Sequence, residues 1–342
     1  MRQENVVLKK LHFHEVLVCM LNSLIGRSVG NEMTLVSLPT SIGGYRLIHP
    51  ILECKEPKFY QFGLYQNSEG KRAIAKQWSG AKKNLNYYWL LNEINAYRGV
   101  WYLYKKNPEL QKRYPHIHIP KLLAVKRKSD RLIMLLEEVK GKSLETIKIP
   151  ARVPIYEETV SFFRELGNHL DVSASQMFRK RSAWTTGFLF IAYLGRAILK
   201  HPEQLPILMK AAFLFTRLFP KLIRDKDISL VHRDLTPSNI FLQGKEIWII
   251  DLQLLVITHR IFELAALNLK RWKDRHYWHL FQSTQTMKNV LNNPDSFAVY
   301  QALTIYLSVL NFVNTYQVSH ETVYSYLQYW LQQNRKVDSV TS

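Results

Sequence analysis

The hydrophobic pattern of this 342-residue chain changes near residue 140. Before that point, β-branched and aromatic residues fall in short runs bounded by turn residues, which is typical of antiparallel strands. After it, from Tyr156 to Asp225 and again from Arg260 onward, long stretches are apolar at helical spacing, with short strand-like runs only between Leu230 and Asp251. This order of elements predicts an α+β protein in which a small antiparallel sheet precedes a larger, mainly helical part.

Two hairpins and one helix are predicted in the first part. Residues 58–78 form two strand-like runs around Asn67-Ser68-Glu69-Gly70, and residues 121–139 form two more around Ser129-Asp130. Between the hairpins, residues 87–106 carry apolar side chains at alternating steps of four and three, the stripe of an amphipathic helix.

Three segments follow from these patterns. Residues 1–45 are predicted to be an N-terminal helical extension, because apolar residues between 8 and 25 have helical spacing. Residues 46–139 would form the small lobe and 140–342 the large lobe, with a helical insertion at about 171–225. We expect a cytoplasmic protein, since no stretch has the length and apolar character of a spanning helix or the features of a secretory signal.

The composition restricts the class of partner. The chain has 47 Lys and Arg against 27 Asp and Glu, a net charge of +20, which favours anionic partners. Nucleic acid is not expected among them, because no zinc-finger, helix-turn-helix or RNA-recognition signature accompanies the basic segment 71–131. Two cysteines, Cys19 and Cys54, exclude a disulfide framework.

The most informative motif lies in the second part. The segment His232–Asn239 contains Asp234, and Asp251 follows at the end of an apolar strand-like run. Phosphoryl transfer needs a group that orients the attacking hydroxyl and oxygen ligands for Mg²⁺. Two carboxylates and one amide supply both functions.

On these residues the chain resembles the protein-kinase-like superfamily, and in particular its aminoglycoside-phosphotransferase-like branch, which includes lipopolysaccharide-core sugar kinases. The spacing from His232 to Asn239 is that of the family's H-R-D-x-x-x-x-N motif. The resemblance implies a bilobal protein-kinase-like fold and the cofactors ATP and Mg²⁺. It also implies that Asp234 is the catalytic base and that Asn239 and Asp251 are the metal ligands.

Upstream residues extend the resemblance to the nucleotide. Ala73-Ile74-Ala75-Lys76 is similar to the family's V-A-I-K, which gives Lys76 the role of phosphate-binding lysine and places Ile74 over adenine. Glu93, on the inward edge of the predicted helix, would pair with Lys76. By the same resemblance, backbone groups of Glu137 and Val139 would face adenine in the hinge between the lobes. Phe241 and Ile250 would line the opposite side.

Departures from the protein-kinase pattern indicate the acceptor. The chain has no G-x-G-x-x-G loop and no A-P-E sequence after Asp251, and Gln253 stands where the family usually has glycine. We therefore expect the acceptor to be a hydroxyl of a small molecule, sugar or glycolipid such as a lipopolysaccharide core. Two alternatives are a pseudokinase-like binding scaffold, which the missing glycine loop favours, and a protein serine/threonine kinase.

One long stretch has two interpretations. Residues 184–219 combine many apolar side chains with Arg196, Lys200, Lys210 and Arg217. They are predicted either to be buried helices of the large lobe or to form a face that contacts an anionic membrane surface. The second interpretation would make the protein peripheral at the inner face of the membrane.

Overall fold

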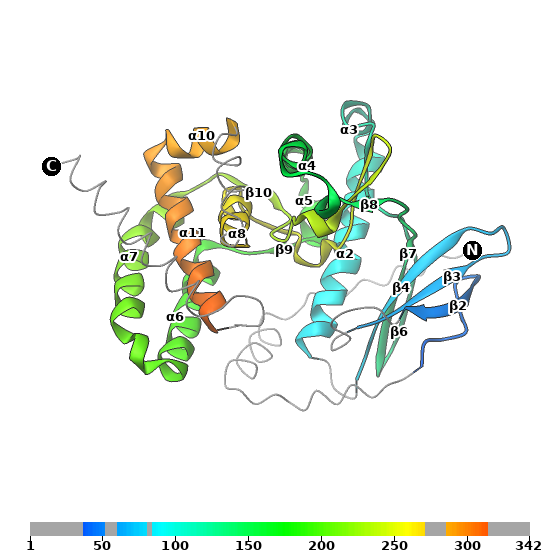
Figure 1. Ribbon diagram of the computed structural model, residues 1–342, viewed down its shortest axis with the longest axis horizontal. Helices are drawn as coiled ribbons and strands as arrows, with labels where there is room; N and C mark the ends of the chain where they lie inside the picture. The colour runs from blue at the N-terminus through cyan, green and yellow to red at the C-terminus, as the bar shows by residue number, and fades with distance from the viewer. Residues whose placement is uncertain (1–36, 52–59, 81–83, 271–284, 314–342) are drawn as a thin grey trace. The chain divides into compact units, whose positions relative to one another are not determined.

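The computed structural model describes residues 37–51, 60–80, 84–270 and 285–313 (Figure 1). Contacts between Cα atoms group the chain into two units. The first comprises residues up to Leu91 together with Leu123–Leu135, and the second comprises Asn92–Leu122 together with the residues from Leu136 onward. The helix expected between residues 8 and 25 lies outside the described residues.

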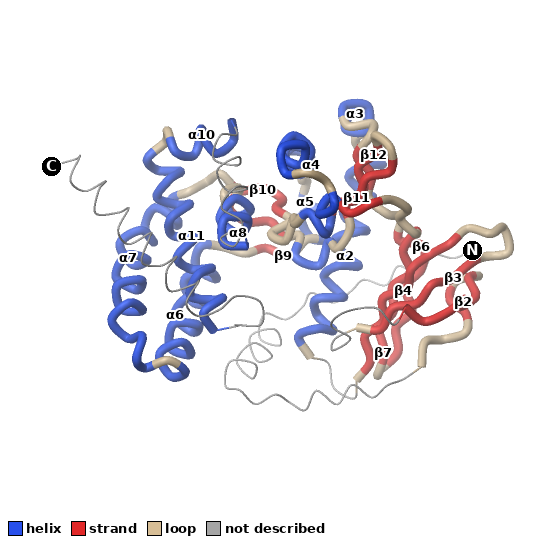
Figure 2. Tube along the Cα trace, in the orientation of Figure 1, coloured by secondary structure: helices blue, strands red, loops and turns tan. Residues whose placement is uncertain are grey.

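The described residues of the first unit lie mostly in a β-sheet (Figure 2). Its strands are β1 (Ser41–Ile42), β2 (Tyr45–Ile51), β3 (Gln61–Gln66), β4 (Arg72–Ser79), β6 (Leu122–Lys128) and β7 (Arg131–Glu137). They are hydrogen-bonded in the order β1-β2-β3-β4-β7-β6, and the β1-β2, β2-β3 and β3-β4 pairs are antiparallel. The four strands predicted from hydrophobic alternation correspond to β3, β4, β6 and β7.

Asn67 and Gly70 stabilise the turn between β3 and β4. The side-chain oxygen of Asn67 accepts hydrogen bonds from the backbone N–H groups of Glu69 and Lys71. Gly70 closes the turn with φ +80°, a conformation that glycine adopts without steric cost. The hairpin predicted at residues 58–78 is therefore confirmed within the described residues.

The end of the expected helical extension is a strand instead. Ile42 pairs with Tyr45 across the turn Gly43-Gly44, and both glycines have positive φ, as two-residue hairpin loops require. Tyr45 and Leu47 pack against the buried core of the sheet. The apolar side chains of this short segment are thus buried in strand geometry, which the helical spacing further upstream did not reveal.

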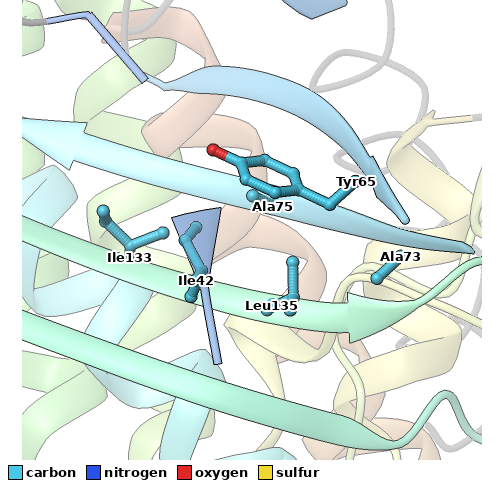
Figure 3. Packing of buried hydrophobic residues seen from close by; sticks show 6 residues of the cluster. All are labelled: Ile42, Tyr65, Ala73, Ala75, Ile133 and Leu135. Atoms are coloured by element: carbon cyan, nitrogen blue, oxygen red, sulfur yellow. The ribbon is translucent and has the colours of Figure 1, made fainter. Parts of the chain in front are cut away.

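Alternation along β4 separates a core face from a second face. Ala73 and Ala75 belong to a buried cluster with Ile42, Tyr65, Ile133 and Leu135 (Figure 3). Side chains of successive strand residues point to opposite faces, so Ile74, Lys76 and Trp78 share the other face, as predicted. The lysine is therefore held on the face that does not contribute to this cluster.

The second unit is mainly helical. Its helices are α2 (Leu85–Lys106, which begins in the first unit), α3 (Pro108–Arg113), α4 (Ile149–Asn168), α5 (Val172–Met177), α6 (Ala183–Lys200), α7 (Leu205–Arg224), α8 (Phe262–Lys270), α10 (Gln285–Leu291) and α11 (Pro294–Val313). Helices α6, α7 and α8 all pack against α11, as Figure 1 shows. None of the described helices combines the length and the hydropathy that crossing a membrane requires.

Two small sheets lie within this unit. Strands β10 (Ile228–Val231), β13 (Val256–His259) and β9 (Arg179–Lys180) form one of them in that order. The other contains β5 (Ile117–His118), β12 (Glu246–Ile249), β11 (Ile240–Gln243) and β8 (Lys142–Ser143). The helical insertion expected at 171–225 contains α5, α6 and α7 but is interrupted by β9, which forms because Arg179 and Lys180 pair in parallel with Val256 and Ile257.

Candidate active site

The predicted catalytic loop connects β10 to β11. The carbonyl oxygen of Asp234 accepts hydrogen bonds from the backbone N–H of Thr236 at 2.8 Å and from the Nδ2 atom of Asn239 at 2.9 Å. Because the amide nitrogen of Asn239 is engaged in this way, its Oδ1 atom points elsewhere and retains its lone pairs. The loop therefore fixes Asp234 relative to an oxygen that can bind a cation.

Asp251 is joined to the same loop through its neighbour. The backbone N–H of Ile250 donates to the carbonyl oxygen of Asn239 at 3.0 Å, and the Nε2 atom of His232 lies 3.4 Å from the carbonyl oxygen of Ile250. Hydrogen bonds thus connect the loop that contains Asp234 and Asn239 to the residue that precedes Asp251. His232 is fully buried and packs against Phe163, with ring centroids 5.4 Å apart, which supports a structural role.

The backbone is strained at two places in this site. Arg233 has φ 61° and Asp251 has φ 57°, and within the described residues they are the two non-glycine residues with positive φ. Such conformations are uncommon for side chains with a Cβ atom and cluster at functional sites. One of the two precedes the predicted base, and the other is the predicted metal ligand.

Helix α2 supports the segment that follows Asp251. The side-chain amide of Asn92 donates to the carbonyl oxygens of Gln253 at 2.7 Å and Leu255 at 3.4 Å. Burial raises the pKa of Tyr97 well above its usual value, and the nearby carboxylates of Glu93 and Asp251 raise it further. Glu93, predicted as a partner of the lysine, is 1% exposed and lies close enough to Tyr97 to act on its hydroxyl group.

Lys76 and Ile74 belong to the first unit, on β4. The ammonium group of Lys76 lies 4.5 Å from the centroid of the Tyr60 ring, a cation–π geometry. Its side chain is only 8% exposed, which is rare for a lysine. A lysine held in this way is restricted in conformation, which suits a residue that must meet a phosphate.

The predicted hinge follows β7. The backbone N–H of Glu137 donates to the carbonyl oxygen of Lys121 at 3.0 Å, so a contact from Glu137 to adenine would use its carbonyl oxygen. Gly141 has φ 150°, and a Cβ atom there would lie 2.5 Å from the carbonyl oxygen of Leu242. The glycine therefore allows the chain after Val139 to run directly against β11.

The residues predicted opposite the hinge lie where β11 and β12 pair. Phe241 faces Trp248 on β12 and Ser143 on β8 in the strand register. Phe241 and Ile250 are both half-buried, which leaves part of each side chain accessible to a ligand. Val139 is half-buried as well.

The donor set fits a magnesium ion that also binds phosphate. The Oδ1 atom of Asn239 and the carboxylate of Asp251 are the hard oxygen ligands that Mg²⁺ prefers, and phosphates and water usually supply the others. The described residues contain no group of three His, Cys, Asp or Glu that would bind a metal without a substrate. His116 and His118 instead contact Glu158 and Glu246, respectively.

Glu263 is a buried group to which sequence analysis assigned no function. It lies in the first turn of α8 and lines, with Tyr156, Arg233 and Asp234, a cavity of about 10 Å³, room for one water molecule. Its pKa is raised to about 8, because the effect of burial outweighs the opposing effects of the Arg164 guanidinium and the Tyr156 hydroxyl. Its only signal in the sequence is its place at the start of the helix that follows Asp251.

Comparisons with known proteins identify one matching family and a group of similar folds. The sequence model of a family described as phosphotransferase enzymes matches residues 108–277. The crystal structure of aminoglycoside phosphotransferase APH(4)-Ia has a TM-score of 0.52 and 12% identity, and the match covers 91% of this chain and 97% of that one. A thermostable mutant of APH(4)-Ia in a ternary complex with AMP-PNP and hygromycin B has a TM-score of 0.51 and 12% identity, covering 84% and 93%. The sequence matches none of the curated proteins.

The structural likeness and the sequence match show different properties of the chain. At 12% identity the structural likeness shows the fold, which is protein-kinase-like and α+β, as predicted. The sequence match adds the resemblance to phosphotransferase enzymes. The predicted resemblance is thereby found at two levels: residues 108–277 match phosphotransferase enzymes in sequence, and aminoglycoside phosphotransferase APH(4)-Ia shares the fold. The relationship to lipopolysaccharide-core kinases stays a prediction.

Proposed function

We propose that this chain, a phosphotransferase of the protein-kinase-like superfamily, transfers the γ-phosphoryl group of ATP to a hydroxyl of a sugar or glycolipid. The sequence match to phosphotransferase enzymes supports the reaction class. The finer assignment of the acceptor is supported by the absence of a peptide-docking sequence after Asp251, where α8 begins at Phe262.

Each residue of the site has one role in this reaction. Asp234 accepts the proton of the attacking hydroxyl. Asn239 and Asp251 would hold Mg²⁺, which neutralises charge on the phosphates, and Lys76 would bind the phosphates directly. Glu137 and Val139 would contact adenine through backbone groups, and Phe241, Ile250 and Ile74 would pack against it.

The observation that carries the proposal is the hydrogen-bonded connection of three residues. The side chain of Asn239 is bound to the backbone of Asp234, and the backbone of Asn239 is bound to Ile250, the residue before Asp251. A base and two metal ligands fixed in one network are preorganised, which is how this class of reaction is accelerated.

The test compares isosteric variants. Asp234→Asn should lower transfer from radiolabelled ATP into cell-envelope extract by about a hundredfold to ten-thousandfold, the usual contribution of a general base. Asp251→Asn should abolish transfer and the Mg²⁺-dependent part of the thermal stabilisation by ATP. The control is Asp227→Asn, because Asp227 is exposed and pairs with Arg260 outside the network.

The same measurements separate the alternatives. A wild-type protein that is not stabilised by ATP in a metal-dependent way would favour the binding scaffold. Transfer to generic peptides, or autophosphorylation, would favour a protein kinase. Wild-type transfer by Asp251→Asn would contradict the assignment of the metal ligand.

A second proposal concerns where the acceptor is met. Exposed apolar residues lie on α6 and α7. Trp184, Phe188 and Ile191 follow one face of α6 at steps of four and three, Leu199 lies near the end of the same helix, and Met209 and Phe213 lie four residues apart on α7. Lys200, Lys210 and Arg217 are exposed beside them. Apolar side chains flanked by cations suit the surface of an anionic membrane, in keeping with a protein that is peripheral at its inner face.

Vesicle co-sedimentation tests this surface. Binding to phosphatidylglycerol vesicles should exceed binding to phosphatidylcholine vesicles and should fall in Phe213→Asp, since Phe213 is 69% exposed. Leu291→Asp is the control, because Leu291 is an exposed apolar residue on α10. Equal binding of both variants would contradict the proposal.

A further inference from the structure

Three arginines gather beside the predicted catalytic base. Arg179 and Arg181 lie on and just after β9, and Arg233 directly precedes Asp234. The backbone N–H of Arg181 donates to Ile257 on β13, which anchors this segment. Three positively charged side chains from two distant parts of the sequence therefore lie close together.

Aromatic rings hold two of these guanidinium groups. Those of Arg181 and Arg233 lie 5.4 Å and 4.5 Å from the centroid of the same ring, that of Phe262. The guanidinium of Arg181 also lies 4.9 Å from the ring centroid of Tyr306 and donates a hydrogen bond to its hydroxyl. Stacking of this kind fixes the planes of the cations and leaves N–H groups at their edges for another ligand.

The three arginines form no ion pair with an Asp or Glu side chain in the part of the chain that the structure describes. The buried Nε atoms of Arg181 and Arg233 have no hydrogen-bond partner among the described residues. All three residues are half-buried, so none of them is fully shielded from solvent.

This arrangement is unfavourable without an anion. Desolvation, together with repulsion from Arg181, lowers the pKa of Arg179 to about 10 and that of Arg233 well below its usual value. Like charges in a partly desolvated place repel each other more strongly than in water. An oxyanion with two or more oxygens would relieve the repulsion and accept the free N–H groups.

The position of the arginines beside Asp234 indicates which molecule would carry the anionic group. Arg233 and Asp234 line the same small cavity, so the cluster begins one residue from the group that would receive the proton of the acceptor. We propose that Arg179, Arg181 and Arg233 bind a carboxylate or phosphate group of the acceptor, which makes the substrate an anionic sugar or glycolipid. This inference rests on the function proposed above. An aminoglycoside, which carries ammonium groups, would meet charge of its own sign there.

The test uses simple oxyanions with the nucleotide site filled. Inorganic phosphate and, separately, acetate are titrated calorimetrically into the full chain saturated with Mg²⁺ and AMP-PNP. We expect one oxyanion to bind, and Arg181→Gln to raise its Kd at least about tenfold, the value of a hydrogen bond to a charged group. Arg224→Gln, the same change at an exposed arginine of α7, should leave the Kd unchanged. Arg181→Lys, which keeps the charge but loses the planar fork, should bind several-fold more weakly than wild type and is informative if Arg181→Gln does not fold.

A second arm identifies the source of the oxyanion. Glucose 6-phosphate, galacturonate and glucose are compared as ligands of the same complex. We expect the binding of one of the two anionic sugars to be lost in Arg181→Gln, and we expect no such loss for glucose. Wild-type affinity in both Arg181 variants, or no oxyanion binding to a protein that binds Mg²⁺ and AMP-PNP normally, would overturn the inference while leaving the proposed phosphotransfer intact. Failure of the wild-type protein to bind Mg²⁺ and AMP-PNP would instead contradict the proposed function. In that case, oxyanion binding measured without nucleotide would test the arginine cluster separately.

Discussion

The side-chain amide of Asn92 donates a 2.7 Å hydrogen bond to the backbone carbonyl of Gln253, a residue 161 positions further along the chain. Asn92 is 5% exposed, so the bond is shielded from water. It attaches α2 to the turn that starts at Asp251. Because the acceptor is a backbone oxygen, the contact tolerates a glutamine where the kinase pattern usually has glycine.

Removing this bond should affect both stability and activity. Asn92→Ala leaves two buried carbonyl oxygens without their donor, which lowers the free energy of unfolding by about 1–3 kcal/mol. It also releases the turn at Asp251, so kcat should fall. Urea unfolding and the transfer assay measure the two effects.

Asn107→Ala is the matched control. The Asn107 side chain donates at 3.0 Å to the carbonyl of Leu103, away from the catalytic loop. It should lower stability by about 1 kcal/mol and leave kcat unchanged. Equal kcat in Asn92→Ala and the wild type would show that α2 does not position Asp251.

The buried carboxyl of Glu263 predicts a pH dependence of stability. Its pKa is raised to about 8 in the folded protein, so between pH 5 and about 8 the folded state binds a proton that the unfolded state has released. Stability therefore falls as the pH rises through this window, by at most about 1.4 kcal/mol per pH unit, and levels off above it.

Glu263→Gln should remove this contribution. We expect the free energy of unfolding of the variant, relative to that of the wild type, to be higher at pH 8 than at pH 5. Urea unfolding at both pH values measures this difference. Glu145→Gln, at an exposed position, should follow the wild-type profile. A wild-type slope in Glu263→Gln would assign the pH dependence to another group.

Two glycines of α6 should respond to alanine with opposite signs. A Cβ atom on Gly187 would lie 2.6 Å from the Phe219 ring, so Gly187→Ala should destabilise by about 1–3 kcal/mol. Gly195 has no atom within 4 Å of such a Cβ, so Gly195→Ala should stabilise by up to about 1 kcal/mol through helix propensity. Thermal unfolding of the pair checks the packing of α6 on α7, and the same sign for both would contradict it.

Lys76→Met should weaken the binding of Mg²⁺ and ATP about tenfold or more, because it removes a charged contact to phosphate. Lys71→Met is the control on the same hairpin, since Lys71 is exposed and pairs with Glu69. Calorimetric titration of both variants measures the difference. Unchanged affinity in Lys76→Met would remove this lysine from the phosphate site.

Local patterns were sufficient for the parts of the fold that depend on neighbouring residues. The turn at Asn67, the stripe of α2 and the loop from His232 to Asn239 all follow from short-range chemistry. The two-residue strand β9 and the bond from Asn92 to Gln253 do not, because each depends on a partner more than seventy residues away. The arginine cluster was not found for the same reason: Arg233 and Arg181 meet only after β9 pairs with β13.

The left-handed backbone at Arg233 and Asp251 has a consequence for anyone seeking a hardier form of this protein. Glycine at either position would relax the main chain, and a screen for heat resistance alone would therefore enrich such replacements. At Asp251 the exchange would also delete the proposed metal ligand. Selection for thermal stability would thus favour glycine at position 251, whereas selection for catalytic turnover would retain Asp251.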